Sequence, residues 1–239
     1  MRSCLLILVL WTATWATAQT VHQVTPVTQP TGSYVAFKFD WDQGRPWLKY
    51  TITLDDAGNT SFKGVANPID NGDGDDYSLD FTMSNANREK VFELAKQSDY
   101  FQGDVEIKAK NIAKTGQKTL EYHGSAASGP SNTSATYNYS PNKDIQQLTQ
   151  LFQSVATTVD MGRRLAFDYR FDKLGLDARL HSLQELQASH FVAELQAIEP
   201  ILRKIAADPN VMHVSRVAAK QLLNSISTTA PAPPMAAQP

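Results

Sequence analysis

The hydrophobic periodicity of this chain changes at Pro141, and this change constrains the fold more than any other feature. Before Pro141, apolar and polar residues alternate in several short segments, which is the pattern of half-buried β-strands. After Pro141, apolar residues recur with a spacing of about 3.6 residues, which is the pattern of amphipathic helices. The sequence therefore predicts an α+β fold with an antiparallel sheet in the first half and an all-helical second half.

The first half contains six alternating segments and one short helical one. In Tyr77–Met83, the Tyr, Leu, Phe and Met side chains share one face and the Ser, Asp and Thr side chains share the other. Gly58 follows two aspartates and an alanine in a predicted hairpin turn. A short helix is predicted around Val91–Ala95, with Ser84 or Asn85 as its N-cap. The predicted strands are 34–41, 47–54, 60–65, 77–83, 118–123 and 134–139.

The second half predicts four helices. Asn142 is the expected N-cap of the first helix, and Pro200 is the expected break within the third. The apolar positions that define these helices span 145–159, 176–186, 191–205 and 211–222.

The first 18 residues predict a signal peptide. A basic start at Arg2 precedes the apolar run Cys4–Trp11, and Ala16-Thr17-Ala18 has the small-x-small form of a cleavage site. Cleavage between Ala18 and Gln19 removes Cys4, the one cysteine, so the expected mature protein contains none. This pattern favours an exported protein, periplasmic or extracellular, in a bacterium.

The predicted organisation has five parts. The signal peptide (1–18) precedes an extended Thr/Gln/Pro-rich leader (19–32), and a strand-rich α+β domain (33–141) precedes a helical region (142–227). The Pro/Ala-rich end, 228–239, carries no charge and is predicted to be a disordered tail.

Composition excludes some classes of function. The chain has 22 Lys and Arg against 24 Asp and Glu, so its formal charge is −2. This balance argues against a nucleic-acid partner recognised through bulk positive charge. After the signal peptide, no apolar run has the length of a transmembrane segment.

The acidic stretch Asp70–Asp76 is the densest candidate for a metal site. Loops rich in Asp, Asn and Gly suit calcium, which prefers several oxygen ligands. In an EF-hand register starting at Asn71, however, the sixth position is Asp76 instead of Gly and the twelfth is Thr82 instead of Glu. A solvated acidic loop is therefore favoured over a calcium site, and no metal ligand is assigned.

No catalytic or cofactor-binding residues are assigned either. His190 and Glu194 are four residues apart and can share a helical face, but a pair supplies two metal ligands at most. The chain contains no GxSxG, phosphate-loop or dinucleotide motif, so no cofactor is expected and a non-enzymatic role is favoured.

Aromatic residues gather in the first predicted hairpin. They form either a surface for a carbohydrate or protein partner or the packing layer of a sheet. Because the alternating members would lie on one face, the packing layer is favoured. The residues are Tyr34, Phe37, Phe39, Trp41, Trp47 and Tyr50.

Two resemblances follow from these segments. Residues 33–160 resemble an uncharacterised family of exported bacterial domains, through Tyr50–Asp55 with Gly58, Val91–Leu94, Tyr100-Phe101, Leu120–Tyr122 and the helix from Ile145. That resemblance implies a fold and an exported setting, without catalytic residues. Residues 201–219 resemble a HEAT-type helix pair, although one such unit cannot bury its faces alone.

These observations favour an exported binding or protein-interaction module of the bacterial envelope, with an envelope protein or a carbohydrate as partner. Two alternatives remain open, a metal-dependent hydrolase of unrecognised type and a structural component of the envelope.

Overall fold

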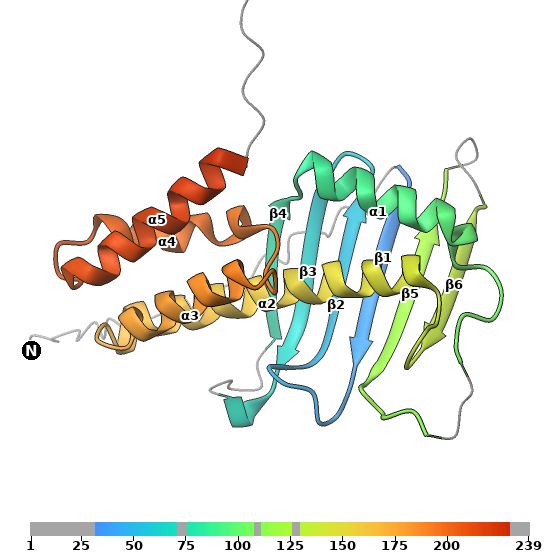
Figure 1. The fold of residues 1–239 in the computed structure, drawn as a ribbon, viewed down its shortest axis with the longest axis horizontal. Helices are drawn as coiled ribbons and strands as arrows, with labels where there is room; N and C mark the ends of the chain where they lie inside the picture. Colours follow the sequence, from blue (N-terminus) through green and yellow to red (C-terminus); the bar gives the residue numbers. More distant parts are fainter. Residues whose placement is uncertain (1–31, 71–75, 108–110, 126–129, 230–239) are drawn as a thin grey trace, which may run out of the picture.

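A computed structural model describes residues 32–70, 76–107, 111–125 and 130–229 of the chain (Figure 1). The predicted signal peptide with its Ala18–Gln19 cleavage site, most of the leader, residues 71–75 of the acidic stretch and residues 230–239 lie outside the described residues.

The first half is a six-stranded antiparallel sheet with the order β4-β3-β2-β1-β5-β6. The first four strands form a meander, and the chain then passes through helix α1 (Asn85–Gln97) and the short helix η2 (Asp99–Phe101) to reach β5 beside β1. A further short helix, η1, spans Pro68–Asp70. The strands are β1 (Tyr34–Asp40), β2 (Trp47–Asp55), β3 (Asn59–Ala66), β4 (Asp76–Thr82), β5 (Gln117–His123) and β6 (Asn132–Tyr137).

Strand alternation gives the sheet one apolar face and one polar face. A transverse row on the apolar face joins Phe37, Ile52, Phe62 and Leu120, which are all fully buried. The opposite face carries a parallel row of Lys38, Thr51, Lys63 and Ser78, which are partly or fully exposed. The period-two pattern therefore identifies correctly which residues face the helices.

The helices cover the apolar face. Helix α2 (Lys143–Phe171) runs across the sheet from β6 towards β4 and continues beyond it, with α1 alongside (Figure 1). The expected caps are confirmed, because Ser84 Oγ accepts the N–H of Asn87 and Asn142 Oδ1 accepts the N–H of Asp144.

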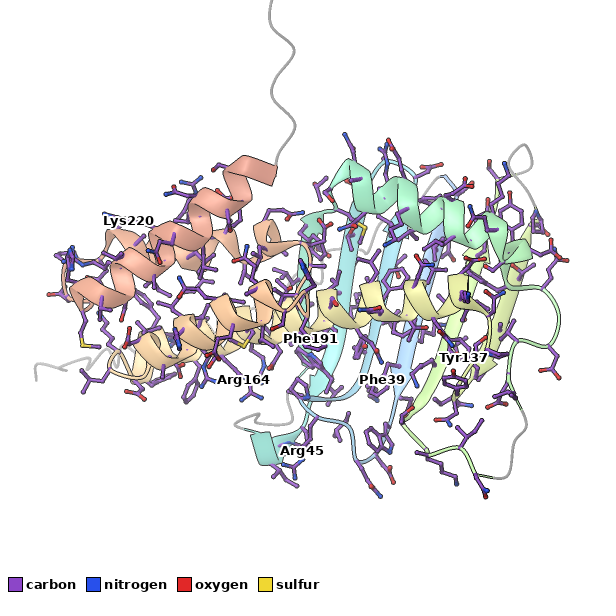
Figure 2. All side chains as sticks on the ribbon, viewed as in Figure 1. Phe39, Arg45, Tyr137, Arg164, Phe191 and Lys220 are labelled. Atoms are coloured by element: carbon purple, nitrogen blue, oxygen red, sulfur yellow. The ribbon has the colours of Figure 1, made fainter. Side chains whose placement is uncertain are left out.

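Helix α2 belongs to two hydrophobic cores. Its first half, through Val159, packs with the sheet, and Phe152 stacks on Phe37 at a ring-centroid distance of 5.3 Å. Its second half, from Met161, packs with the helices that follow. In Figure 2, Phe39 and Tyr137 lie in the sheet half, and Arg164 and Lys220 lie in the helical half. The later helices are α3 (Leu176–Ala188), η3 (Leu195–Ile198), α4 (Glu199–Ala207) and α5 (His213–Thr229).

The third predicted helix differs from the observed structure. Helix α3 ends at Ala188, and Phe191 lies in an irregular connection instead of a helix. Pro200 lies in the first turn of α4, where its missing N–H costs no hydrogen bond. The break instead falls at residues 189–194, in which His190 and Glu194 have left-handed φ values of 59° and 60°. The α+β class and the helical second half are confirmed.

Candidate binding pocket beside α1

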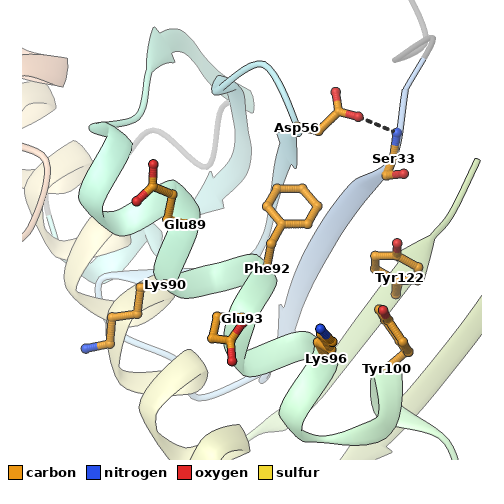
Figure 3. Close-up of a pocket in the computed structure, with 9 residues that line it drawn as sticks. All are labelled: Ser33, Asp56, Glu89, Lys90, Phe92, Glu93, Lys96, Tyr100 and Tyr122. Carbon is orange, nitrogen blue, oxygen red and sulfur yellow. Dashed lines mark hydrogen bonds between the residues drawn. The ribbon is translucent and has the colours of Figure 1, made fainter. Parts of the chain in front are cut away.

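A hollow of about 720 Å³ opens between α1 and the ends of β1, β2 and β5 (Figure 3). Helix α1 forms one wall, and the start of β1, the turn after β2, the η2 turn and β5 form the others. The lining residues are Ser33, Asp56, Glu89, Lys90, Phe92, Glu93, Lys96, Tyr100 and Tyr122.

Three aromatic side chains make the pocket apolar at its base. Phe92 and Tyr100 are half-buried, and Tyr122 is 2% exposed. The rings of Tyr100 and Tyr122 lie 4.5 Å apart, centroid to centroid, at an interplanar angle of 43°. Such rings offer a large apolar contact area together with hydroxyl groups for hydrogen bonds.

Tyr100 reaches the pocket through an uncommon backbone turn. Asp99, Tyr100 and Phe101 all have positive φ, at 49°, 52° and 65°, although none of them is glycine. The left-handed conformation costs roughly 1 to 2 kcal/mol for each such residue. The burial of Phe101 (0% exposed) and a hydrogen bond from Thr133 Oγ1 to the Tyr100 carbonyl hold the turn in place. Strain of this kind is often found at functional sites.

Hydrogen bonds fix the chain at the mouth of the pocket. The N–H of Ser33 donates to Oδ2 of Asp56 (3.1 Å), and the N–H of Ser125 donates to Oγ of Ser33 (3.1 Å). Gly32 lies so close to Asp56 that a Cβ at this position would be 2.5 Å from Oδ1 of the carboxylate. The segment before β1 therefore leaves the sheet beside the pocket.

Charged side chains surround the aromatic base. Asp56, Glu89 and Glu93 contribute three acidic groups, and Lys90 and Lys96 contribute two basic ones. All five side chains belong to exposed residues. An apolar base within a hydrated, charged rim suits a ligand that buries one side and keeps the other in water.

A second hollow of about 540 Å³ lies on the polar face of the sheet. Its lining includes Lys38, Lys49, Lys63, Asp40 and Asp76. Lys38 already pairs with Glu121 at 2.6 Å, and Asp40 lies opposite Lys49 in the sheet register. This surface resembles an ordinary solvated sheet face, so the α1 pocket is the stronger candidate.

The acidic stretch gives no metal site within the described residues. Asp76 and Asp80 belong to β4, and both are exposed on the polar face. In 32–70, 76–107, 111–125 and 130–229, no three His, Cys, Asp or Glu residues lie together as a metal site would need. Residues 71–75 themselves fall outside those ranges, so the calcium hypothesis is untested.

His123 lies on the polar face of the sheet. Its ring stacks on that of Tyr34 at a centroid distance of 4.2 Å, and its Nδ1 lies 2.6 Å from Oδ1 of Asn132.

The expectation that His190 and Glu194 share a helical face is wrong. Both lie in the irregular connection after α3, because left-handed residues interrupt the helix there.

Glu194 instead joins the two halves of the molecule. Its side chain is buried, and its carboxylate accepts hydrogen bonds from the N–H (2.7 Å) and Oγ (2.7 Å) of Ser84, the N-cap of α1. It also accepts from Nδ2 of Asn87 (2.5 Å) and from Nε2 of Gln196. A carboxylate at this position complements the positive end of the α1 dipole.

The aromatic hairpin is a packing layer, as predicted, for Phe37, Phe39, Trp47 and Tyr50, which are all buried. Those four residues therefore offer no contact surface. The pocket uses Phe92, Tyr100 and Tyr122, which the sequence did not single out as a site. Their proximity depends on the sheet register and on the left-handed turn, and neither can be read from residue spacing.

The helical half contains no transmembrane candidate: none of the helices in the described ranges is both long and apolar enough to cross a bilayer.

Comparisons of the chain with protein-family models, curated proteins and solved structures returned no match. The resemblances to exported domains and to HEAT helix pairs therefore stay predictions.

Proposed function

We propose that this protein is an exported, non-enzymatic binding module of the bacterial envelope, and that its α1 pocket receives an extended apolar segment of a protein partner. The observation that carries the proposal is the aromatic base of Phe92 on α1, Tyr122 on β5 and Tyr100, which lies in a turn of three consecutive left-handed residues. Strained backbone of this kind is common at ligand-binding sites, and here it places the Tyr100 ring 4.5 Å from that of Tyr122.

The aromatic lining of the pocket favours a segment rich in proline. Aromatic-lined grooves bind polyproline II (PPII) segments because these are already extended and lose little entropy on binding. The charged rim formed by Asp56, Glu89, Glu93, Lys90 and Lys96 remains hydrated beside the backbone of such a segment. The predicted signal peptide, with cleavage between Ala18 and Gln19, supports the envelope as the setting.

Site-specific photo-crosslinking tests this function. A photoreactive amino acid replaces Glu93 at the pocket or, as a control, Thr53 on the polar face. The partner captured only from position 93 is then purified, and its affinity for the protein is measured. The proposal expects Phe92→Ala to weaken that affinity at least tenfold, while Phe191→Ala, which truncates an aromatic 60% exposed elsewhere, changes it less than twofold. Equal affinities for the two variants, or capture of glycan alone, would refute the proposal.

A further inference from the structure

The rim of the α1 pocket carries opposite charges at its two ends. Glu89, Phe92 and Lys96 line the pocket and follow one another at intervals of three and four residues, so they lie along one face of α1. The aromatic ring is therefore between an acidic and a basic residue. At 1.5 Å per residue, Glu89 and Lys96 are about 10 Å apart along the helix axis.

The acidic end is where the β2–β3 turn meets the start of α1. Asp56 belongs to that turn, and a Cβ built on Gly58 of the same turn would lie 3.6 Å from Cδ of Arg88, the neighbour of Glu89. Nη2 of Arg88 lies 3.5 Å from Oε1 of Glu89, at the limit of a hydrogen bond. Two carboxylates against one guanidinium leave this end negative.

The basic end is the last turn of α1. Lys96 is exposed, and in Figure 3 it lies on the Tyr100 side of Phe92, away from Asp56. Among the described residues, the Lys96 ammonium has no ion-pair partner. A positive charge is therefore available to a ligand at the end of the pocket formed by the two tyrosines.

The remaining rim charges do not cancel this polarity. The Lys90 side chain points away from Phe92 in Figure 3. Glu93 lies between the two ends, and its Oε1 accepts a hydrogen bond from Nε2 of Gln97 at 2.8 Å. The pocket is thus negative at the β2–β3 turn and positive at the end of α1.

We infer that the partner segment in this pocket is dipolar: a proline-rich stretch with one basic and one acidic side chain three residues apart. The inference rests on the proposed function and specifies the chemistry of its partner. Residues three apart in a PPII helix share one edge and are about 9 Å apart, close to the spacing of Glu89 and Lys96. The basic side chain lies beside Asp56 and Glu89, the acidic one lies beside Lys96, and proline rings on another edge contact the aromatic base.

The two kinds of contact have different roles in this binding. Contacts between exposed charges change an affinity by only a few fold, so the aromatic base supplies most of the affinity. The charges instead select among proline-rich segments, because a segment with the wrong charge meets a like charge at one end of the pocket. Salt should weaken this selection and leave the aromatic contacts in place.

Four fluorescent peptides of equal length test the inference. They share a proline-rich frame and carry, three residues apart, one Lys and one Glu, two Lys, two Glu or two Gln. In titrations of a chain beginning at Gln19 at low ionic strength, we expect the Lys/Glu peptide to bind at least about threefold more tightly than the other three. The preference should vanish in about 1 M salt, where the Debye length is about 3 Å. Equal affinities at low salt, or no binding of the Lys/Glu peptide, would overturn the inference.

Lys96→Glu should change which peptide binds best. Both ends of the pocket are then acidic, so the peptide with two Lys should become the tightest ligand. The matched control is Lys220→Glu, which makes the same change in net charge at an exposed position of α5 in the helical half (Figure 2). The control should keep the original order of affinities. The same order in both variants would contradict a role for Lys96 in selection.

Phe92→Ala separates this inference from the proposed function. If the crosslinked partner binds in a Phe92-dependent manner but the four peptides bind equally, the proposed function stands and the dipolar inference fails. If the peptides show the charge preference and Phe92→Ala leaves their affinities unchanged, the charges act outside the pocket and the inference also fails. If position 93 captures no protein while the preference depends on Phe92 and Lys96, the dipolar pocket stands and the proposed function fails.

Discussion

Replacing Glu194 with alanine should loosen the two halves of the protein from each other. The substitution removes one carboxylate that accepts four hydrogen bonds from Ser84, Asn87 and Gln196. Because Glu194 is 6% exposed, water cannot freely replace the lost oxygens. Ser84 and Asn87 would lose this acceptor at the start of α1, while Nε2 of Gln196 would keep the carbonyl of Thr82.

The magnitude follows from these contacts. A buried donor left unsatisfied costs about 1 to 3 kcal/mol, and all four hydrogen bonds to Glu194 are partly buried, so we expect a total loss of about 3 kcal/mol. This is a large fraction of the roughly 5 to 15 kcal/mol that stabilises a typical domain. Glu194→Gln keeps the size and one acceptor oxygen, and should cost about half as much.

Urea unfolding with two probes provides the assay. In a chain beginning at Gln19, the tryptophans are Trp41 and Trp47, which lie in the sheet half, so their fluorescence reports mainly on that half and on the part of α2 packed against Trp47. Far-UV circular dichroism reports mainly on the helices. The two transitions should coincide in the original protein and separate in Glu194→Ala, with the helices unfolding at lower urea concentration.

The matched control is Glu185→Ala, because the Glu185 side chain is 67% exposed in its pair with His181. An exposed pair of this kind contributes at most about 1 kcal/mol. A loss below about 0.5 kcal/mol in Glu194→Ala, with coincident transitions, would show that this contact does not couple the halves.

Three further predictions concern packing, backbone strain and pH. Gly162→Ala should destabilise the protein by about 1 to 3 kcal/mol, measured by urea unfolding, because the added Cβ would lie 2.3 Å from Cγ2 of Ile198; an unchanged midpoint would contradict this. Asp99→Gly should raise the free energy of unfolding by up to about 1 kcal/mol, because glycine relieves the left-handed strain at φ 49°, and a lower melting temperature would argue against that strain. Burial raises the pKa of Tyr137 to about 12 and raises the pKa of Tyr50 further. Since a tyrosine in the unfolded chain ionises near pH 10, the unfolded state gains stability above that pH, and Tyr137 alone should remove about 1.4 kcal/mol at pH 11. Tyr137→Phe should flatten that alkaline decline, and an unchanged slope would contradict the assignment.

The sequence predicts most of the sheet because its alternation is strong. Tyr77, Leu79 and Phe81 face the helices in β4, as the period of two indicates, and Ser84 and Asn142 cap the helices as their side-chain chemistry indicates. These features depend on neighbours within a few residues, and local patterns therefore report them well.

The candidate site could not be predicted in the same way. Tyr100 and Tyr122 are brought together by the pairing of β5 with β1 and by a left-handed turn in residues other than glycine. The break at residues 189–194 escaped prediction for a related reason. The tertiary contacts of Glu194 with α1 outweigh the helical pattern of its apolar neighbours.

The shared helix α2 has a consequence for how this protein can change over evolutionary time. Loops between domains usually accept insertions, but here the joint between Val159 and Met161 is inside a continuous helix. Each inserted residue would turn the helical half by about 100° and move it by about 1.5 Å relative to the sheet. Such a turn would carry Glu194 away from Ser84 and Ala193 away from Thr158. We therefore expect length variation among descendants of this chain to avoid the middle of α2 and to occur in the connections around it.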